Sequence, residues 1–375
     1  MDWGQVMAKE WEAIWHNKRV LAILLLVPIL YLLLFGSLYR ENKVKEIATL
    51  VLDEDQSVLS QQIIQAFDAS ETFAVVGTAA SEEDLVQSLR RGEVAVGVIV
   101  PRNPSQVLTL IDGSNMIVSN AALRAANEIV QTFSLQLAVQ KWKGNPVAIS
   151  SEFRILFNPG FSYSTFLLLG LLGAVVQQVV FLGIAFSVTR EALSGPPLAV
   201  LCGKAVPYFL LGLFDALVTV RMANAVYGIP FLGRPSHYLL LSVAFILALV
   251  GIGMFFSLMA KDALQAVQLT MLIAVPSFLL SGFTWPFSAM PDWVATLGHF
   301  LPLTYFLHGL REVAIKGNGW EMVAGDVHVL LKMALVTFVL AYVLAWVKVK
   351  RQSRKMRSSE TASVATEPAG NSSAS

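Results

Sequence analysis

The chain has 375 residues, of which 55% are hydrophobic and only 14% are charged, and its formal net charge is +1. Soluble domains carry about 25% charged residues, so this composition excludes an ordinary water-soluble protein and indicates that lipid surrounds part of the chain. Its single cysteine, Cys202, excludes an internal disulfide and a paired-cysteine metal site.

The N-terminal residues 1–19 predict an amphipathic helix. Trp3, Met7, Trp11 and Ile14 recur at helical spacing, with Trp15 beside them. Because tryptophan favours the lipid headgroup region, we predict an interfacial helix on the cytoplasmic membrane surface. A helix packed on protein is the alternative.

Six apolar runs are long enough to cross a bilayer, for which about 20 residues are needed. Their predicted bounds are Val20–Tyr39, Ser162–Val188, Ala205–Ile229, His237–Ala260, Ala263–Phe283 and Val327–Val347. Lys18 and Arg19 before the first run are also typical of a signal peptide, but no small-x-small cleavage site follows, which favours an uncleaved anchor over 20–39.

Residues 40–160, between the first two runs, predict a small α/β domain. Short β-rich runs bounded by turn residues alternate there with helical patterns. The predicted strands are Ile47–Leu52, Phe73–Gly77, Val94–Val100 and Val107–Ile111, and the predicted helices are Ser57–Phe67, Ser81–Arg91 and Val118–Trp142. The fold class is therefore an α-helical polytopic membrane protein with about six spans and an α/β domain between spans 1 and 2.

The stretch 284–325 is apolar but interrupted by prolines and glycines, which predicts short re-entrant helices packed against the bundle on the outer side. After Lys350 the chain is first basic and then, from Ser358, rich in Ser, Ala, Thr and Glu, so residues 350–375 predict a cytoplasmic tail that ends in disorder.

Lysine and arginine flank the spans mostly on one side. These residues are Lys9, Lys18, Arg19, Arg190, Lys204, Lys261, Lys348, Lys350, Arg351, Arg354, Lys355 and Arg357. Cytoplasmic loops carry such an excess, so both termini are predicted to be cytoplasmic and the domain 40–160 extracytoplasmic.

No motif for ATP binding or catalysis occurs. The fragment Gly203-Lys204-Ala205 lacks the earlier glycine and the hydroxyl of a phosphate-binding loop. We expect His299 and His308 to be interfacial or hydrogen-bonded rather than metal ligands, and Asp53-Glu54-Asp55 to form an acidic turn rather than a cation site. No catalytic, cofactor-binding or metal-binding residue is expected.

Polar residues inside the predicted spans are costly and need an explanation. Asp215 and Arg221 lie six residues apart in the third span, which places them about 120° apart on the helix and disfavours a direct pair. Each is expected either to pair with another helix, which we favour, or to line a translocation path. Gln177 and Gln178 in the second span have the same alternatives, with helix association favoured.

Several segments, in order, resemble the membrane subunit of ABC-2 type transporters, specifically bacterial exporters with a large loop after the first span. The segments that carry the resemblance are Val51–Ser57 (VLDEDQS), Leu89–Val94 with Val98–Pro101, the turn Asp112–Asn115 (DGSN), Phe157–Pro159, Ser281–Phe283, Met290–Pro291, Pro302–Phe306 and Gly309–Arg311. Together they cover about residues 1–350, and the resemblance identifies 161–349 as the ABC-2 type transmembrane domain.

One loop departs from the family pattern. Between the second and third spans the family usually has an acidic, glycine-containing signature, whereas this chain has the shorter, proline-bearing Thr189–Pro197. The resemblance implies that this loop contacts an ATPase, which makes Arg190, Glu191 and Lys204 the candidate coupling residues.

The resemblance implies an exporter permease in the bacterial inner membrane. Two permease subunits, identical or similar, would form the pathway, and separate ABC ATP-binding subunits would bind the ATP. A periplasmic adaptor and membrane lipid are further expected partners, and nucleic acid is not. The competing interpretation is a non-transport membrane anchor or sensor whose outer domain binds a ligand or partner, but a single span would suffice for that role.

Overall fold

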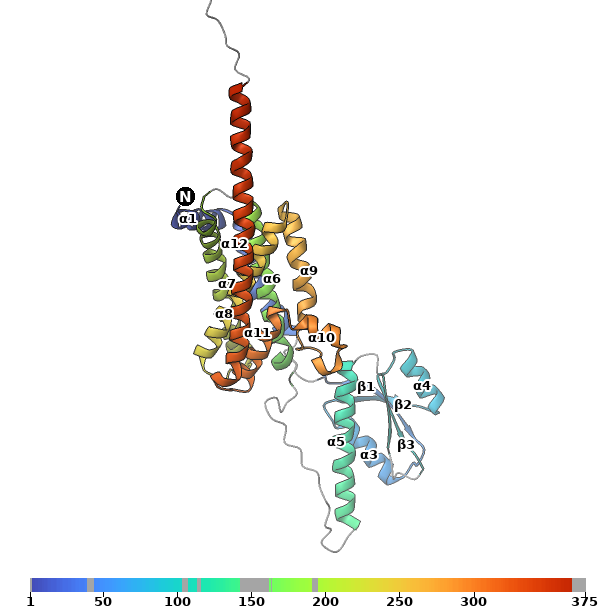
Figure 1. Ribbon diagram of the computed structural model, residues 1–375. Helices are drawn as coiled ribbons and strands as arrows, with labels where there is room; N and C mark the ends of the chain where they lie inside the picture. Colours follow the sequence, from blue (N-terminus) through green and yellow to red (C-terminus); the bar gives the residue numbers. More distant parts are fainter. Residues whose placement is uncertain are drawn as a thin grey trace, which may run out of the picture. The chain divides into compact units, whose positions relative to one another are not determined.

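The computed structural model describes residues 2–38, 44–102, 107–112, 116–141, 162, 164–190 and 195–365. The chain divides into two compact units, an α/β unit over Glu41–Ser162 and a helical unit formed by Met1–Arg40 and Tyr163–Ser375. Figure 1 shows both units and labels many of their helices and strands. The turn residues 113–115, the segment 157–159 and Glu191 lie outside the described residues.

The α/β unit has the predicted alternation of strands and helices. Its elements are β1 (Ile47–Asp53), α3 (Val58–Asp68), β2 (Phe73–Thr78), α4 (Glu82–Arg90), β3 (Val96–Val100), β4 (Leu108–Ile111) and α5 (Met116–Lys141). The sheet order is β2-β1-β3-β4, with β1 parallel to both β2 and β3, and β4 antiparallel to β3. Helices connect the parallel strands, as crossover connections require.

Both faces of this sheet are covered. On one face, Val98 belongs to a core with Phe67 of α3 and Ala122 of α5, and on the other face Ile99 packs with Leu85 of α4. Successive strand residues point to opposite faces, which is why β3 reads as a continuous apolar run.

The acidic turn after β1 is confirmed. Asp53 accepts hydrogen bonds from the backbone of Asp55 and Gln56 and from the hydroxyl of Ser60 in the first turn of α3. The carboxylate therefore organises a strand-to-helix turn.

The helical unit contains six helices that are long and apolar enough to cross a membrane, counted over the described residues. With the finding of the α/β sheet, this confirms the predicted fold class. The elements of the unit are α1 (Trp3–His16), α2 (Lys18–Leu38), η1 (Ser164–Leu168), α6 (Leu169–Arg190), α7 (Pro197–Tyr227), α8 (Pro235–Met259), α9 (Ala263–Leu280), η2 (Phe287–Ala289), α10 (Asp292–Gly298), α11 (Pro302–Leu310), η3 (Arg311–Ile315) and α12 (Trp320–Ala365).

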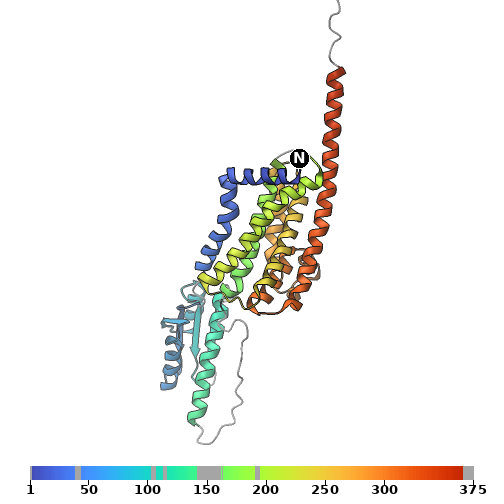
Figure 2. The same cartoon turned by 90° about the vertical axis from the view of Figure 1, so that its left-hand side faces the viewer.

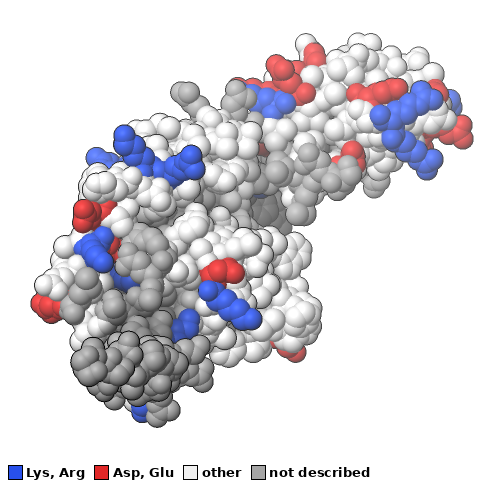
Figure 3. Space-filling view, turned by 90° about the horizontal axis from the view of Figure 1, so that it is seen from above, with Lys and Arg blue, Asp and Glu red and all other residues white. Residues whose placement is uncertain are grey.

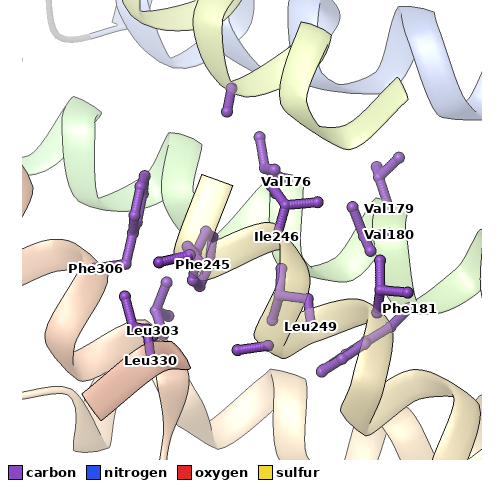
Figure 4. Packing of buried hydrophobic residues seen from close by; sticks show 14 of the residues in the cluster. Val176, Val179, Val180, Phe181, Phe245, Ile246, Leu249, Leu303, Phe306 and Leu330 are labelled. Atoms are coloured by element: carbon purple, nitrogen blue, oxygen red, sulfur yellow. The ribbon is translucent and has the colours of Figure 1, made fainter. Parts of the chain in front are cut away.

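Helices α6 and α8 form the centre of the bundle. Both are apolar on all sides, the pattern of a helix buried all round. Figure 4 shows their side chains packed with those of α11 and α12, and the rings of Phe245 and Phe306 stack with centroids 4.0 Å apart. The stretch 284–325 has the predicted short helices, with α11 packed into this core.

Helix α1 lies crosswise to the long helices (Figure 2). The face that packs on protein consists of Val6, Glu10 and Ile14, whereas Trp3 and Trp15 are exposed. The alternative interpretation, a helix packed on protein, therefore holds for one face, and the exposed tryptophans leave another face for a membrane surface. We call this end of the helical unit the α1 end, and the opposite one, with α10 and α11, the α11 end.

Helix α12 is longer than predicted. It continues beyond Lys350 to Ala365, although we expected disorder from Ser358. No glycine or proline occurs between Gly325 and Pro368, so nothing in the sequence interrupts the helix after it leaves the bundle.

Candidate functional site

At the α1 end, a buried ion pair joins α1 to α7. Nζ of Lys204 lies 3.2 Å from Oε2 of Glu10 and donates to the backbone oxygen of Ser187 on α6 at 2.7 Å. The hydroxyl of Tyr208 donates to Oε1 of Glu10 at 2.9 Å. These four residues, the Glu10–Lys204 cluster, connect three helices through side chains that are almost fully buried.

Glycines allow the close approach that this cluster needs. A Cβ at Gly203 of α7 would lie 2.7 Å from Cβ of Val6 and 2.9 Å from the backbone oxygen of Trp3, and one at Gly183 of α6 would lie 2.7 Å from the ring of Tyr208. Since real Cβ atoms do not approach so closely, larger residues at Gly203 or Gly183 would force α1 or Tyr208 away.

Of the three predicted coupling residues, Lys204 is the one whose side chain the structure describes. Lys204 is inside the cluster, 5% exposed, so its charge is committed to Glu10. Arg190 is the last residue of α6, and Glu191 lies outside the described residues. Sequence reasoning missed Glu10 and Tyr208, although Glu10 interrupts the apolar stripe of Val6 and Ile14, a signal that a buried acid seeks a cation.

Exposed basic side chains gather around this cluster's end of the unit. Seen from the α1 end, Lys and Arg side chains are spread over the surface (Figure 3). By their positions on the helices, the exposed basic residues of this end include Lys9 on α1, Lys18 and Arg19 at the start of α2, Lys261 between α8 and α9, and Lys350 on α12. This distribution is the asymmetry on which the predicted topology rests.

Farther along the bundle, α6, α7 and α8 meet at Gly212 of α7. A Cβ there would lie 2.6 Å from Cγ2 of Val180 on α6 and 3.2 Å from Cγ2 of Ile246 on α8. The three residues therefore define one level of the bundle.

One helical turn from this level toward the α11 end, each helix carries a buried polar residue on the same face. These are Gln177 on α6, Asp215 on α7 and Ser242 on α8, and we call them the polar layer. The register has independent support, because the hydroxyl of Tyr238 on α8 donates to the backbone oxygen of Ala216 at 2.6 Å.

The polar layer is incompletely hydrogen-bonded. Neither amide atom of Gln177 nor Oδ2 of Asp215 has a partner among the described residues. Thr219 donates to the backbone oxygen of Asp215 and not to its carboxylate. Buried polar groups normally have partners, so this layer has the capacity to bind water or a polar group of a transported molecule.

The other two intramembrane residues lie apart from this layer. Arg221 is exposed and donates to Oδ1 of Asn224 at 2.9 Å, and it makes no contact with Asp215. Gln178 is half-buried beside the fully buried Gln177. The structure therefore brings Gln177 and Asp215 to one level and leaves Arg221 near the end of α7.

No metal-binding arrangement occurs among the described residues, where no three His, Cys, Asp or Glu side chains come together. His299 and His308 are hydrogen-bonded, as expected, to the backbone oxygen of Ala295 and to Asp326.

Comparison with known proteins gives the chain a family. Residues 18–343 match the family described as ABC-2 family transporter protein. Two Escherichia coli K12 proteins described as probable multidrug ABC transporter permeases are similar: YbhR, 26% identical over 90% of this chain and 96% of its own length, and YbhS, 24% identical over 94% and 98%. The linearmycin resistance permease protein LnrN of Bacillus subtilis is 20% identical over 88% of this chain and 95% of its own. The matched residues extend from the first candidate span into the last of the six found among the described residues. The chain is therefore a multi-pass membrane protein that belongs to the ABC-2 family of transporters.

Proposed function

We propose that this permease exports small molecules across the inner membrane and is powered by separate ATP-binding subunits. Family membership implies such an ATP-binding partner, and the names of the relatives, multidrug and linearmycin resistance permeases, suggest drug-like substrates. Two permease subunits would enclose the pathway, both termini would be cytoplasmic, and the chain itself would neither bind nor hydrolyse ATP.

The observation that best supports coupling is the Glu10–Lys204 cluster. It fixes α1 to α7 and to the last turns of α6, which ends at Arg190 directly before the connection that begins with Glu191. An ATPase that contacts α1 or this connection at the α1 end would therefore act on α7 through buried, charge-assisted contacts. We assign the contact itself to the connection and the surface of α1, and the transmission to Lys204.

The pathway is assigned to the polar layer. Asp215 lies on α7, three turns from Lys204, so a movement of α7 started at the cluster would reach the groups that lack partners. Gln177 would contribute to the same path from α6. We leave Arg221 and Gln178, which lie apart from the polar layer, outside this path.

The proposal is tested by reconstituting the full chain with its co-purified ATP-binding subunit in liposomes. The pure chain should show no ATP hydrolysis, and the complex should hydrolyse ATP faster when substrate is present. Arg190→Glu combined with Glu191→Lys should leave assembly intact and uncouple hydrolysis from transport, whereas Arg221→Glu, a control near the other end of α7, should not. Substrate-independent hydrolysis in every complex that assembles would contradict the proposal.

Topology has its own test. Reporter fusions within 40–160 and at Ser288 should give an extracytoplasmic signal, and fusions after Lys350 a cytoplasmic one. A cytoplasmic signal from the α/β unit would overturn the assignment of an exporter with this orientation.

A further inference from the structure

The helical unit contains a pocket of about 310 Å³ at the α11 end. It is lined by the residues that follow α9, by Phe287 of η2, by His299 directly after α10, by α11, by Arg311 of η3 and by Asp326 of α12. Phe283, Phe287 and Leu307 form apolar parts of its wall, and the polar lining includes His299, His308 and Arg311. Such a mixture of aromatic wall and few polar groups is typical of a small-molecule site.

Two glycines shape the aromatic wall. Gly282 has a φ of 74°, and a Cβ there would lie 2.4 Å from the ring of Phe287. A Cβ at Gly298 would lie 2.7 Å from the same ring. The ring of Phe287 also stacks on His299, with centroids 4.5 Å apart. Phe287 is therefore held in place as part of the pocket, and larger residues at either glycine would displace it.

Arg311 presents a fixed cation to the pocket. Its guanidinium carbon lies 4.5 Å from the ring centroid of Phe283 and 6.0 Å from that of Phe166, and its Nη2 donates to the backbone oxygen of Phe283 at 3.2 Å. Arginine has five N–H donors, so most of them remain available. Stacking on the aromatic faces restricts the orientation of the fork.

The charged groups that neighbour Arg311 form close pairs with one another. Nδ1 of His308 lies 2.8 Å from Oδ2 of Asp326, a hydrogen bond that raises the pKa of His308 and favours its charged form. Burial alone would raise the pKa of Glu312, but hydrogen bonds from Lys316 and Asn318 bring it below its ordinary value, so Glu312 is ionised and paired with Lys316. No described carboxylate forms an ion pair with Arg311.

We propose that this pocket binds an anionic amphiphile, whose carboxylate or phosphate pairs with Arg311 while its apolar body lies against Phe283, Phe287 and Leu307. The planar fork of arginine suits the two oxygens of such a group. The ligand chemistry is the same for a lipid of the surrounding bilayer and for an amphiphilic molecule on its way out. This site is separate from the polar layer and does not depend on the ATP-driven export proposed above.

The test uses the full chain in nanodiscs of phosphatidylcholine and the fluorescent probe 11-(dansylamino)undecanoic acid, with its methyl ester as the neutral counterpart. The acid should bind about 10- to 100-fold more tightly than the ester, as a hydrogen-bonded charge pair predicts. Arg311→Gln should abolish this preference, and Arg311→Lys should keep part of it. Arg221→Gln removes an exposed arginine of the same unit and should leave the preference unchanged.

Equal binding of acid and ester by the wild-type chain overturns the proposal, and so does an unchanged preference in folded Arg311→Gln. Because the first comparison needs no variant, the proposal remains testable if Arg311→Gln fails to fold. Nanodiscs containing phosphatidylglycerol distinguish the two sources. If the ligand is a lipid, phosphatidylglycerol should weaken probe binding to the wild type, and it should weaken probe binding to Arg311→Lys to a smaller extent. If the ligand is a transported amphiphile, phosphatidylglycerol should leave probe binding unchanged.

Discussion

The Glu10–Lys204 cluster and the polar layer both place polar side chains inside an apolar helix bundle, and they do so in opposite ways. In the cluster, each charge has an oppositely charged or hydrogen-bonding partner from another helix. In the polar layer, Asp215 and Gln177 lie one turn from a tight helix contact and retain unpartnered atoms. Burial alone therefore does not distinguish a polar group that holds helices together from one that awaits a ligand or water.

The difference has an energetic basis. Removing one member of a buried pair leaves an uncompensated charge, so the cluster is stable only when complete. A buried carboxylate without a partner is already destabilised by the loss of its hydration. Substituting it therefore removes little that stabilises the folded state. Substitutions in the two regions should accordingly separate stability from transport.

The largest effect is expected for Lys204→Met. It removes the ammonium that lies 3.2 Å from Oε2 of Glu10, and the loss of one member of a buried pair typically costs about 3–5 kcal/mol. The midpoint of thermal unfolding of the purified protein and the yield of folded protein should both fall sharply. Lys9→Met, at an exposed lysine of α1, is the matched control and should behave as wild type. The double variant Glu10→Gln with Lys204→Met should recover part of the loss, and its failure to do so would show that the pair is not the source of the effect.

A smaller loss is expected for Tyr208→Phe. This change removes one hydrogen bond to a charged group, worth about 1.5–3 kcal/mol, and keeps the ring that packs near Gly183. The midpoint of thermal unfolding should lie between those of the wild type and Lys204→Met. A value equal to that of the wild type would mean that Glu10 depends on Lys204 alone.

Asp215→Asn should affect transport while leaving stability nearly unchanged. The substitution keeps the shape of the side chain and removes its acidic group, whose Oδ2 has no hydrogen-bond partner among the described residues. Folded yield, thermal stability and transport rate are measured together on the reconstituted complex. A marked loss of stability would instead favour pairing with another helix, the interpretation that the sequence alone favoured.

Arg221→Gln is expected to have the smallest effect. The guanidinium is exposed and bonded to Asn224 on its own helix, so its loss should change stability by no more than about 0.5 kcal/mol. Transport should also remain close to wild type. A strong transport defect in this variant would extend the pathway to the end of α7.

The sequence predicted the parts that depend on local pattern. The spans were found because apolar runs of sufficient length have few other uses, and the strands because β-rich runs end in turn residues such as Asp53 to Gln56. The sequence did not predict which face of α1 packs on protein, because attention went to the stripe through Trp3 and Trp11, which was expected to lie on the membrane surface. Glu10 becomes an acceptable buried residue only beside Lys204, almost 200 positions later.

Long-range register was also beyond the sequence. The sequence suggested considering Asp215 and Arg221 together because they share a helix. The residues that lie at the same level as Asp215 are instead determined by the contact of Gly212 with α6 and α8. Arg311 lies in a segment that resembles the family, Gly309–Arg311. Only the structure shows that the neighbouring His308 and Glu312 pair with Asp326 and Lys316 and do not form an ion pair with Arg311.

The polar residues of α7 also bear on how the protein is made. This helix carries Lys204, Asp215 and Arg221, whereas its neighbours α6 and α8 carry no Lys, Arg, Asp or Glu within their apolar spans. In insertion by the translocon, a charge near the centre of a helix costs about 2.5–3.5 kcal/mol. Asp215 lies near the centre of α7 and Lys204 nearer its start, and both α6, which carries Gln177, and α1, which carries Glu10, have already been synthesised when α7 emerges from the ribosome. We therefore expect α7 to enter the bilayer inefficiently when expressed by itself and efficiently behind the segments that precede it.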